Sequence, residues 1–151
     1  MRTLANILWH FPLLGFLSAL GTFLIGGFFV ITVIGTPIGL GLIQLSKFLL
    51  TPFSSVMIDK KDLNIDQNKL WQSFGFIIRI LYLPFGAFLA FLAICQIAVL
   101  FISIIGIPIA VVLAKSLGTF FNPVNKICVS NAVQKELEHR KAKEYVSKSM
   151  G

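Results

Sequence analysis

Two long runs of apolar residues dominate the chain, and each is interrupted by one Gly-x-Pro sequence. Residues 11–46 and 80–114 contain no charged side chain. Each run is much longer than the roughly 20 residues that cross a bilayer once. The interruptions are Gly35-Thr36-Pro37 and Gly106-Ile107-Pro108, and a proline within a helix removes a backbone donor. The pattern therefore predicts two membrane units, each folded back on itself at its Gly-x-Pro turn.

The two units align with each other at a single offset. A shift of 71 residues places Gly35 on Gly106, Pro37 on Pro108 and Pro52 on Pro123. Because chance rarely aligns three such signals, we interpret the units as repeats. Each repeat is predicted to contain a long segment, 4–34 or 74–105, then the turn, then a shorter segment, 37–53 or 108–124. The shorter segments are about 25 Å long at 1.5 Å per residue, so they either barely span the bilayer or re-enter it.

These features predict an all-α integral membrane protein. Since each repeat is expected to begin and end on the same side, we expect two parallel repeats related by a pseudo-two-fold axis along the membrane normal. The predicted units are membrane repeats at 1–53 and 74–124, a cytoplasmic loop at 54–73 and a basic amphipathic helical tail at 125–151. The turns either lie at the far interface as ordinary hairpins or sit at membrane depth, where protein or a wet cavity must surround their unpaired backbone.

Composition and charge agree with a location in lipid. The chain is 56% hydrophobic and 13% charged, which leaves too few polar residues to cover a soluble globule of this size. The net charge is +7, but the basic residues are dispersed and no segment gathers them with interleaved aromatic residues, so we expect no nucleic-acid partner. Lysine and arginine flank the apolar segments and are absent from the turns. The positive-inside rule then places both termini and the central loop in the cytoplasm, with the tail against anionic lipid or a neighbouring protein.

Further motifs frame the apolar segments. They are Asn6-Ile7-Leu8-Trp9 near the start, Lys47 and Lys115 after the turns, and the steps Pro52-Phe53 and Pro123-Val124. With the Ile-Gly-x-Pro turns, they resemble the YccF family of small bacterial inner-membrane proteins, which are built on a duplicated inner membrane component domain. The departures from the family pattern are Ala110 and Asn125 at usual glycine positions and Arg79-Ile80-Leu81-Tyr82 where Asn-Ile-Leu-Trp would recur. The resemblance implies an integral inner-membrane protein and no particular activity.

Residue types that carry chemistry are scarce in the apolar segments. All six acidic residues lie in the loop or the tail, whereas proton-coupled carriers commonly keep an intramembrane carboxylate. No nucleophile, base and orienting group occur together, and we therefore expect no enzyme, no cofactor and no metal site. Cys95 and Cys128 are expected to be small packing residues in a reducing or lipid environment.

Two lysines are the candidate functional residues. Lys47 and Lys115 are the formal charges inside the shorter segments, and an ionisable residue within the membrane is a functional candidate. They would line an anion-favouring vestibule together with Gln44, Ser46, Ser116 and Thr119. The alternative is that both lysines extend their ammonium groups to the nearby interface.

A stripe of small residues is expected to pack helices together. Gly15, Ala19, Thr22 and Gly26 recur at helical spacing in the first long segment. Such stripes let helices approach closely in lipid, where no hydrophobic effect drives them together. We expect helix packing here, with pore lining as the alternative.

Two functions follow from this sequence. The first is a homo-oligomeric, channel-like conduit for ions or small solutes, which the broken helices and the two lysines suggest. The alternative is a non-conducting membrane scaffold or assembly subunit. A conduit needs an uncovered polar strip through the bilayer, whereas a scaffold buries the same polar residues in packed helix contacts.

The charge distribution gives a prediction of topology. Reporter fusions at Lys61 and at Met150 should both report the cytoplasm, because the lysines and arginines gather in the loop and the tail. The measurement is the activity of a reporter that works on only one side of the membrane. A periplasmic signal from either fusion would contradict the charge argument.

Overall fold

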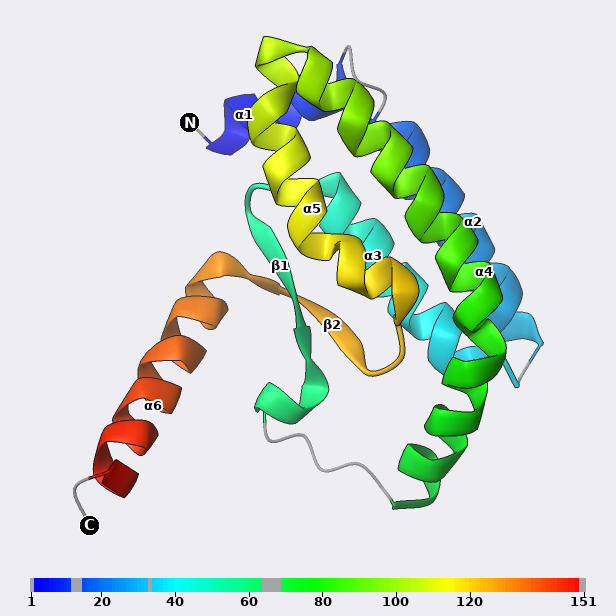
Figure 1. The fold of residues 1–151 in the computed structure, drawn as a ribbon, viewed down its shortest axis with the longest axis vertical. Helices are drawn as coiled ribbons and strands as arrows, with labels where there is room; N and C mark the ends of the chain where they lie inside the picture. Colours follow the sequence, from blue (N-terminus) through cyan, green and yellow to red (C-terminus); the bar gives the residue numbers. More distant parts are fainter. Residues whose placement is uncertain (1, 12–14, 33, 64–68, 150–151) are drawn as a thin grey trace.

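The computed structural model describes residues 2–11, 15–32, 34–63 and 69–149, which are mainly helical. Two helical hairpins dominate it (Figure 1). The first pairs α2 (Gly15–Ile31) with α3 (Thr36–Leu50), and the second pairs α4 (Lys69–Ile102) with α5 (Ile107–Phe121). The remaining elements are α1 (Arg2–His10), β1 (Ser55–Asp59), β2 (Lys126–Ser130), α6 (Asn131–Ser149) and the short turns η1 (Lys60–Leu63) and η2 (Ile104–Gly106). The predicted all-α class is therefore right in outline.

Both hairpins turn at the Gly-x-Pro sequences. Pro37 and Pro108 occupy the first turn of α3 and of α5, where the missing N–H has no intrahelical partner to lose. A side chain at Gly35 would lie 2.8 Å from the carbonyl oxygen of Phe29, and one at Gly106 would collide with that of Leu100. Glycine is needed here because the chain folds back against the last turns of the preceding helix.

A two-stranded sheet links the hairpins, and the sequence analysis did not predict it. β1 pairs with β2 in antiparallel register, from Ser55 opposite Ser130 to Asp59 opposite Lys126. Just beyond the strands, the N–H of Lys60 donates to the carbonyl of Asn125 (2.9 Å), and the N–H of Asn131 donates to that of Ser54 (3.1 Å). The segments predicted as a polar loop and as the start of a helical tail each contribute one strand.

The offset of 71 residues recurs in the element bounds. It separates α3 from α5 at both ends, since 36 + 71 = 107 and 50 + 71 = 121. It also separates β1 from β2, since 55 + 71 = 126 and 59 + 71 = 130. Met57 pairs with Cys128, and these two residues are also 71 apart. The sheet is thus symmetric about its central pair, as a local two-fold axis through that pair requires.

The two hairpins run in opposite directions, so the predicted parallel arrangement is wrong. Near the start of α2, Ser18 Oγ accepts a hydrogen bond from Gln96 Nε2 near the end of α4 (3.1 Å). At the other end of α2, the ring of Phe29 lies 6.1 Å from that of Tyr82 and 5.4 Å from that of Phe85. Antiparallel pairing of strands that occupy equivalent places after each hairpin imposes this reversal. The two turns consequently lie at opposite ends of the molecule (Figure 1).

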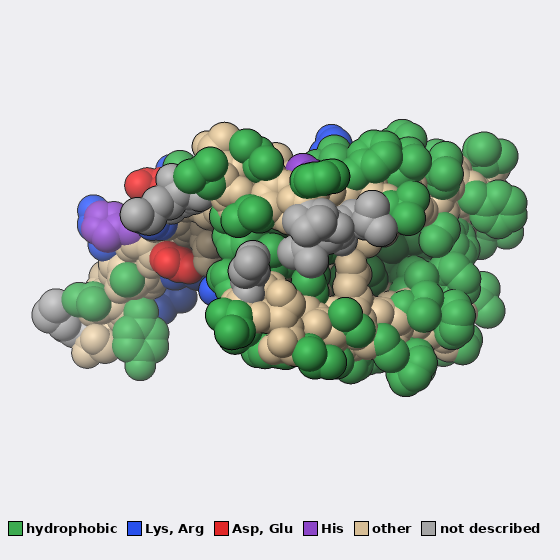
Figure 2. All heavy atoms as spheres, turned by 90° about the horizontal axis from the view of Figure 1, so that it is seen from above, with side chains coloured by type: hydrophobic (Ala, Val, Ile, Leu, Met, Phe, Trp, Pro, Cys, Tyr) green, Lys and Arg blue, Asp and Glu red, His purple; other side chains and the backbone are tan. Residues whose placement is uncertain are grey.

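The core lies between the shorter helices and their neighbours, while the longer helices expose apolar surface. Leu42, Leu45, Ile109 and Leu113 of α3 and α5 are buried. The large hydrophobic side chains of α2 and α4 are mostly exposed, and Figure 2 shows such side chains covering one end of the molecule. Among the described residues, one segment of 29 residues, Phe74–Ile102, is long and apolar enough to cross a membrane, and the bent pair of α1 and α2 would form a second.

The contact of α2 with α3 predicts a selective effect of substitution. A side chain at Gly26 would lie 3.0 Å from the carbonyl oxygen of Gly39, whereas one at Gly27 meets nothing within 4 Å. We expect Gly26→Leu to destabilise the protein by about 1–3 kcal/mol, because overpacking forces the helices apart. Gly27→Leu is the matched control and should change the unfolding midpoint in mild detergent much less. Equal midpoints for the two variants would show that Gly26 does not set the helix contact.

Candidate functional site

Charged side chains gather at the end of the molecule opposite the exposed apolar helices. We call this end the polar pole and define it by β1, η1, β2 and α6, together with the last turns of α3 and α5. Figure 2 shows its lysine, arginine and acidic side chains apart from the hydrophobic end. α6 extends away from the hairpins (Figure 1), and its residues from Glu138 to Ser149 are exposed. The polar pole is therefore the part of the described protein suited to water.

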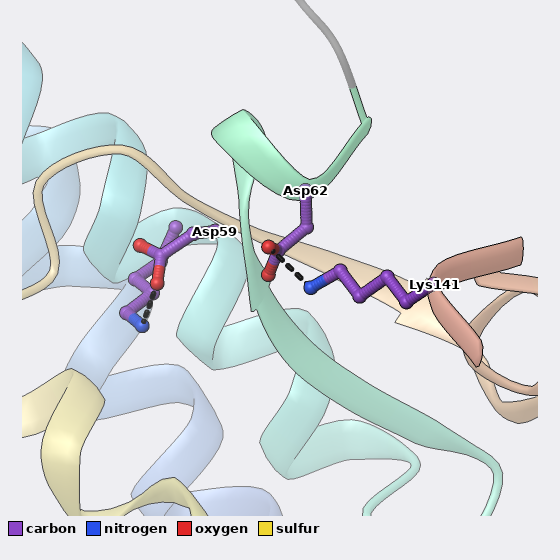
Figure 3. Close-up of polar contacts among 4 residues, drawn as sticks. Asp59, Asp62 and Lys141 are labelled. Atoms are coloured by element: carbon purple, nitrogen blue, oxygen red, sulfur yellow. Dashed lines mark hydrogen bonds and ion pairs between the residues drawn. The ribbon is translucent and has the colours of Figure 1, made fainter. Parts of the chain in front are cut away.

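Ion pairs hold the polar pole together. Lys126 Nζ lies 2.9 Å from Asp59 Oδ2 across the sheet, and Lys141 Nζ of α6 lies 2.6 Å from Asp62 Oδ1 of η1 (Figure 3). The side chain of Lys126 is 21% exposed and that of Lys141 is 58% exposed, so the pair in the sheet is the better shielded. Exposed pairs contribute about 0–1 kcal/mol. The contact of Lys141 thus orients α6 more than it stabilises the fold.

Both terminal helices meet at the start of β1. Asn6 Nδ2 of α1 donates to Ser54 Oγ (3.2 Å), and Asn6 Oδ1 accepts the N–H of Phe53 (3.2 Å). From the other side, Asn131 Nδ2 at the start of α6 donates to the carbonyl of Phe53 (2.9 Å). The asparagine of the Asn-Ile-Leu-Trp motif therefore ties α1 to the polar pole, a role that the sequence motif alone did not reveal.

The tryptophan of that motif has a counterpart in the second hairpin. Trp9 Nε1 donates to the carbonyl of Leu49 (2.6 Å), and Tyr82 Oη donates to that of Phe120 (3.2 Å). The two acceptors are 71 residues apart, since 49 + 71 = 120. Both rings are buried. Arg79-Ile80-Leu81-Tyr82 accordingly occupies the place of Asn-Ile-Leu-Trp.

The six residues predicted to line a vestibule differ in their exposure and in their hydrogen-bond partners. Ser46, Ser116 and Thr119 are buried, and the first two hydroxyl groups each donate 2.8 Å hydrogen bonds within their own helices. Lys47 and Lys115 are exposed. Gln44 is partly buried, and its Oε1 accepts the N–H of Cys128 (3.3 Å).

Lys115 lines a pocket of about 300 Å³ in the polar pole. The walls include Phe48, Val56, Gln134 and Glu138, so the pocket lies between α3, α5, β1 and the first turns of α6. The other five predicted residues do not line it. The lysines and the hydroxyl groups therefore do not converge on this pocket.

The small-residue stripe of α2 lies on the packed side of the helix. Gly15 lies under the ring of Trp9, where a side chain would collide, and Ala19 is buried. Gly26 contacts Gly39 of α3. Thr22 is partly exposed, and its hydroxyl donates to the carbonyl of Ser18 in its own helix (2.8 Å).

Cys128 occupies the centre of the sheet beside Lys47. Burial raises the pKa of its thiol, and a hydrogen bond with Ser55 and the positive charge of Lys47 oppose that shift. The thiol is therefore mainly protonated at neutral pH and a weak nucleophile. Among the described residues, no three His, Cys, Asp or Glu side chains are grouped to hold a metal ion.

The environment of Cys128 predicts a pH-dependent reaction. In a Cys95→Ser background, alkylation of Cys128 should speed up as pH rises from 7 to 9, because the thiolate is the reacting form. Lys47→Ala should slow alkylation at fixed pH, since the lost positive charge no longer favours the thiolate. Lys115→Ala is the matched control. If the two lysine variants alkylate at the same rate as the parent, Lys47 does not act on this thiol.

Comparison with known proteins agrees with the family resemblance. Residues 4–55 match the family model described as the YccF inner membrane component domain. This span covers all but the first two residues of α1, together with α2, α3 and the first residue of β1, and includes Trp9, the first Gly-x-Pro turn and Pro52. No curated protein and no solved structure matches the chain. The match supports the family resemblance over this span: residues 4–55 are similar to the YccF inner membrane component domain.

Proposed function

We propose that this inner-membrane protein is a non-conducting scaffold, whose apolar helices hold the polar pole at the cytoplasmic face. The observation that carries the proposal is the burial of Ser46, Ser116 and Thr119 inside the protein. Hydroxyl groups that lined a conduit would face a water-filled path. In this chain two of them are satisfied by carbonyls of their own helices, and helix packing covers all three.

The proposed scaffold consists of two copies of one unit. The shared offset of α3 with α5 and of β1 with β2 supports this interpretation, as do the equivalent hydrogen bonds of Trp9 and Tyr82. In a closed symmetric pair, each unit offers the same surface to the other. The sheet has that property, because its central pair joins equivalent residues. The second unit then acts as a built-in partner for the first.

The proposed orientation places α2 and α4 in lipid and the polar pole in the cytoplasm. At 1.5 Å per residue, the apolar part of α4 is about 43 Å long and exceeds a hydrocarbon core of about 30 Å, so α4 crosses with a tilt or lies partly along the interface. Asn6 and Asn131 both contact Ser54, which supports termini on the same side. The exposed charges of α6 supply a surface for cytoplasmic partners.

Thiol labelling in intact membranes tests whether the hydroxyl groups are covered. In a background with Cys95→Ser and Cys128→Ser, we expect Ser116→Cys and Thr119→Cys to resist a water-soluble maleimide, because packed side chains surround these positions. Lys47→Cys and Lys115→Cys should react from the cytoplasmic side, since both positions are exposed. Rapid labelling of the folded Ser116→Cys variant would place a wet path beside α5 and exclude the scaffold.

Ion flux tests the conduit prediction directly. We expect liposomes that contain the well-inserted parent protein to show no more flux than empty liposomes. In a conducting homo-oligomer, Lys47→Glu and Lys115→Glu would invert the local field and change the preference for anions over cations. A parent flux whose selectivity responds to these substitutions would favour the conduit over the scaffold.

A further inference from the structure

A second pocket in the polar pole has a basic wall. Its volume is about 240 Å³, and it lies between η1, the early part of α4 and the segment that joins α5 to β2. The residues that line it include Lys61, Phe76, Arg79, Asn122, Val124 and Asn125. No aspartate or glutamate belongs to the described lining.

The nearby carboxylates are engaged elsewhere. Asp59 pairs with Lys126, and Asp62 pairs with Lys141. Within the described part of the chain, no carboxylate lies within ion-pair distance of Lys61 or Arg79. Two cations from separate elements therefore face the same pocket and favour an anion there.

In the first hairpin, Asn6 occupies the place that corresponds to Arg79. Asn6 is bonded to Phe53 and Ser54, and the residues 71 positions later are Val124 and Asn125. Arg79 begins the stretch that corresponds to Asn6-Ile7-Leu8-Trp9. In one half, the amide of Asn6 forms hydrogen bonds with Phe53 and Ser54. In the other half, the guanidinium group of Arg79 takes its place beside a pocket.

The pocket also offers an unpaired acceptor. Asn122 Oδ1 is buried and has no hydrogen-bond partner among the described residues. A buried polar atom without a partner is unfavourable, so an occupant that donates a hydrogen bond would stabilise this site.

We propose that this pocket binds the headgroup of an anionic glycerophospholipid. The phosphate accepts hydrogen bonds from Lys61 and Arg79, because guanidinium groups recognise phosphate well. A headgroup hydroxyl donates to Asn122. Phe76 is 63% exposed and Ile80 is 59% exposed, so the adjoining face of α4 can contact the acyl chains. The proposal rests on the membrane location in the proposed function but not on the absence of conduction.

The test measures lipid binding to the full chain purified in mild detergent. Phosphatidylglycerol, phosphatidylcholine and inorganic phosphate are titrated separately, with bound lipid counted by native mass spectrometry and the unfolding midpoint recorded. We expect phosphatidylglycerol to bind the parent and Lys61→Gln or Arg79→Gln to weaken it about tenfold. Lys60→Gln removes the same charge one residue away from Lys61, outside the pocket lining, and should leave binding within about twofold of the parent.

Three outcomes would overturn the assignment. Equal weakening by Lys60→Gln would indicate diffuse attraction to the whole basic surface. Equal binding of phosphatidylcholine would remove the requirement for net negative charge. Inorganic phosphate that stabilises the parent as well as phosphatidylglycerol would identify a soluble phosphate site instead. If Arg79→Gln fails to insert, Lys61→Gln outside α4 decides the result, and the liposome flux experiment tests the scaffold separately.

Discussion

The arrangement of the two hairpins depends on the pairing of β1 with β2. Within each hairpin the two helices pack on each other, α2 on α3 and α4 on α5. The sheet adds main-chain hydrogen bonds between the halves. Two more such bonds follow just beyond the strands, from the N–H groups of Lys60 and Asn131. Since Met57 pairs with its counterpart Cys128, this one register sets the opposite directions of the hairpins and places α6 beside η1.

The helices and turns could be predicted from the sequence because local chemistry determines them. A charge-free run with one Gly-x-Pro break can satisfy its backbone in lipid only as two helices joined by a turn. The strands have five residues each, and each finds its partner 71 positions away. No local pattern encodes that partner, so the sequence predicts a cytoplasmic loop at 54–73 and no strand there. The predicted parallel direction of the second hairpin is wrong for the same reason. The strand register sets that direction, and the sequence pattern does not reveal the register.

The candidate site was grouped by residue type, whereas helix phase decides where a side chain points. Ser46 and Lys47 are neighbours on α3, and a step of about 100° per residue sends one inward and the other outward. Ser116 and Thr119 are three residues apart and share the buried face with Leu113. That periodicity was visible in the sequence. The hydrogen bond from the backbone of Cys128 to Gln44 was not, because it joins α3 to a strand far along the chain.

The halves are most alike where their backbones must meet and least alike where the protein faces water. Trp9 and Tyr82 both bond to a carbonyl near the end of the shorter helix, although one ring is an indole and the other a phenol. That contact requires only a large aromatic ring that carries one hydrogen-bond donor, so an indole or a phenol ring can fill the place. Asn6 and Arg79 differ in charge and reach, and the exposed guanidinium belongs to a pocket wall. The symmetric arrangement of the hairpins tolerates this difference. The first half keeps the hydrogen bonds of Asn6 to Phe53 and Ser54, whereas the second half has a pocket that can hold a ligand.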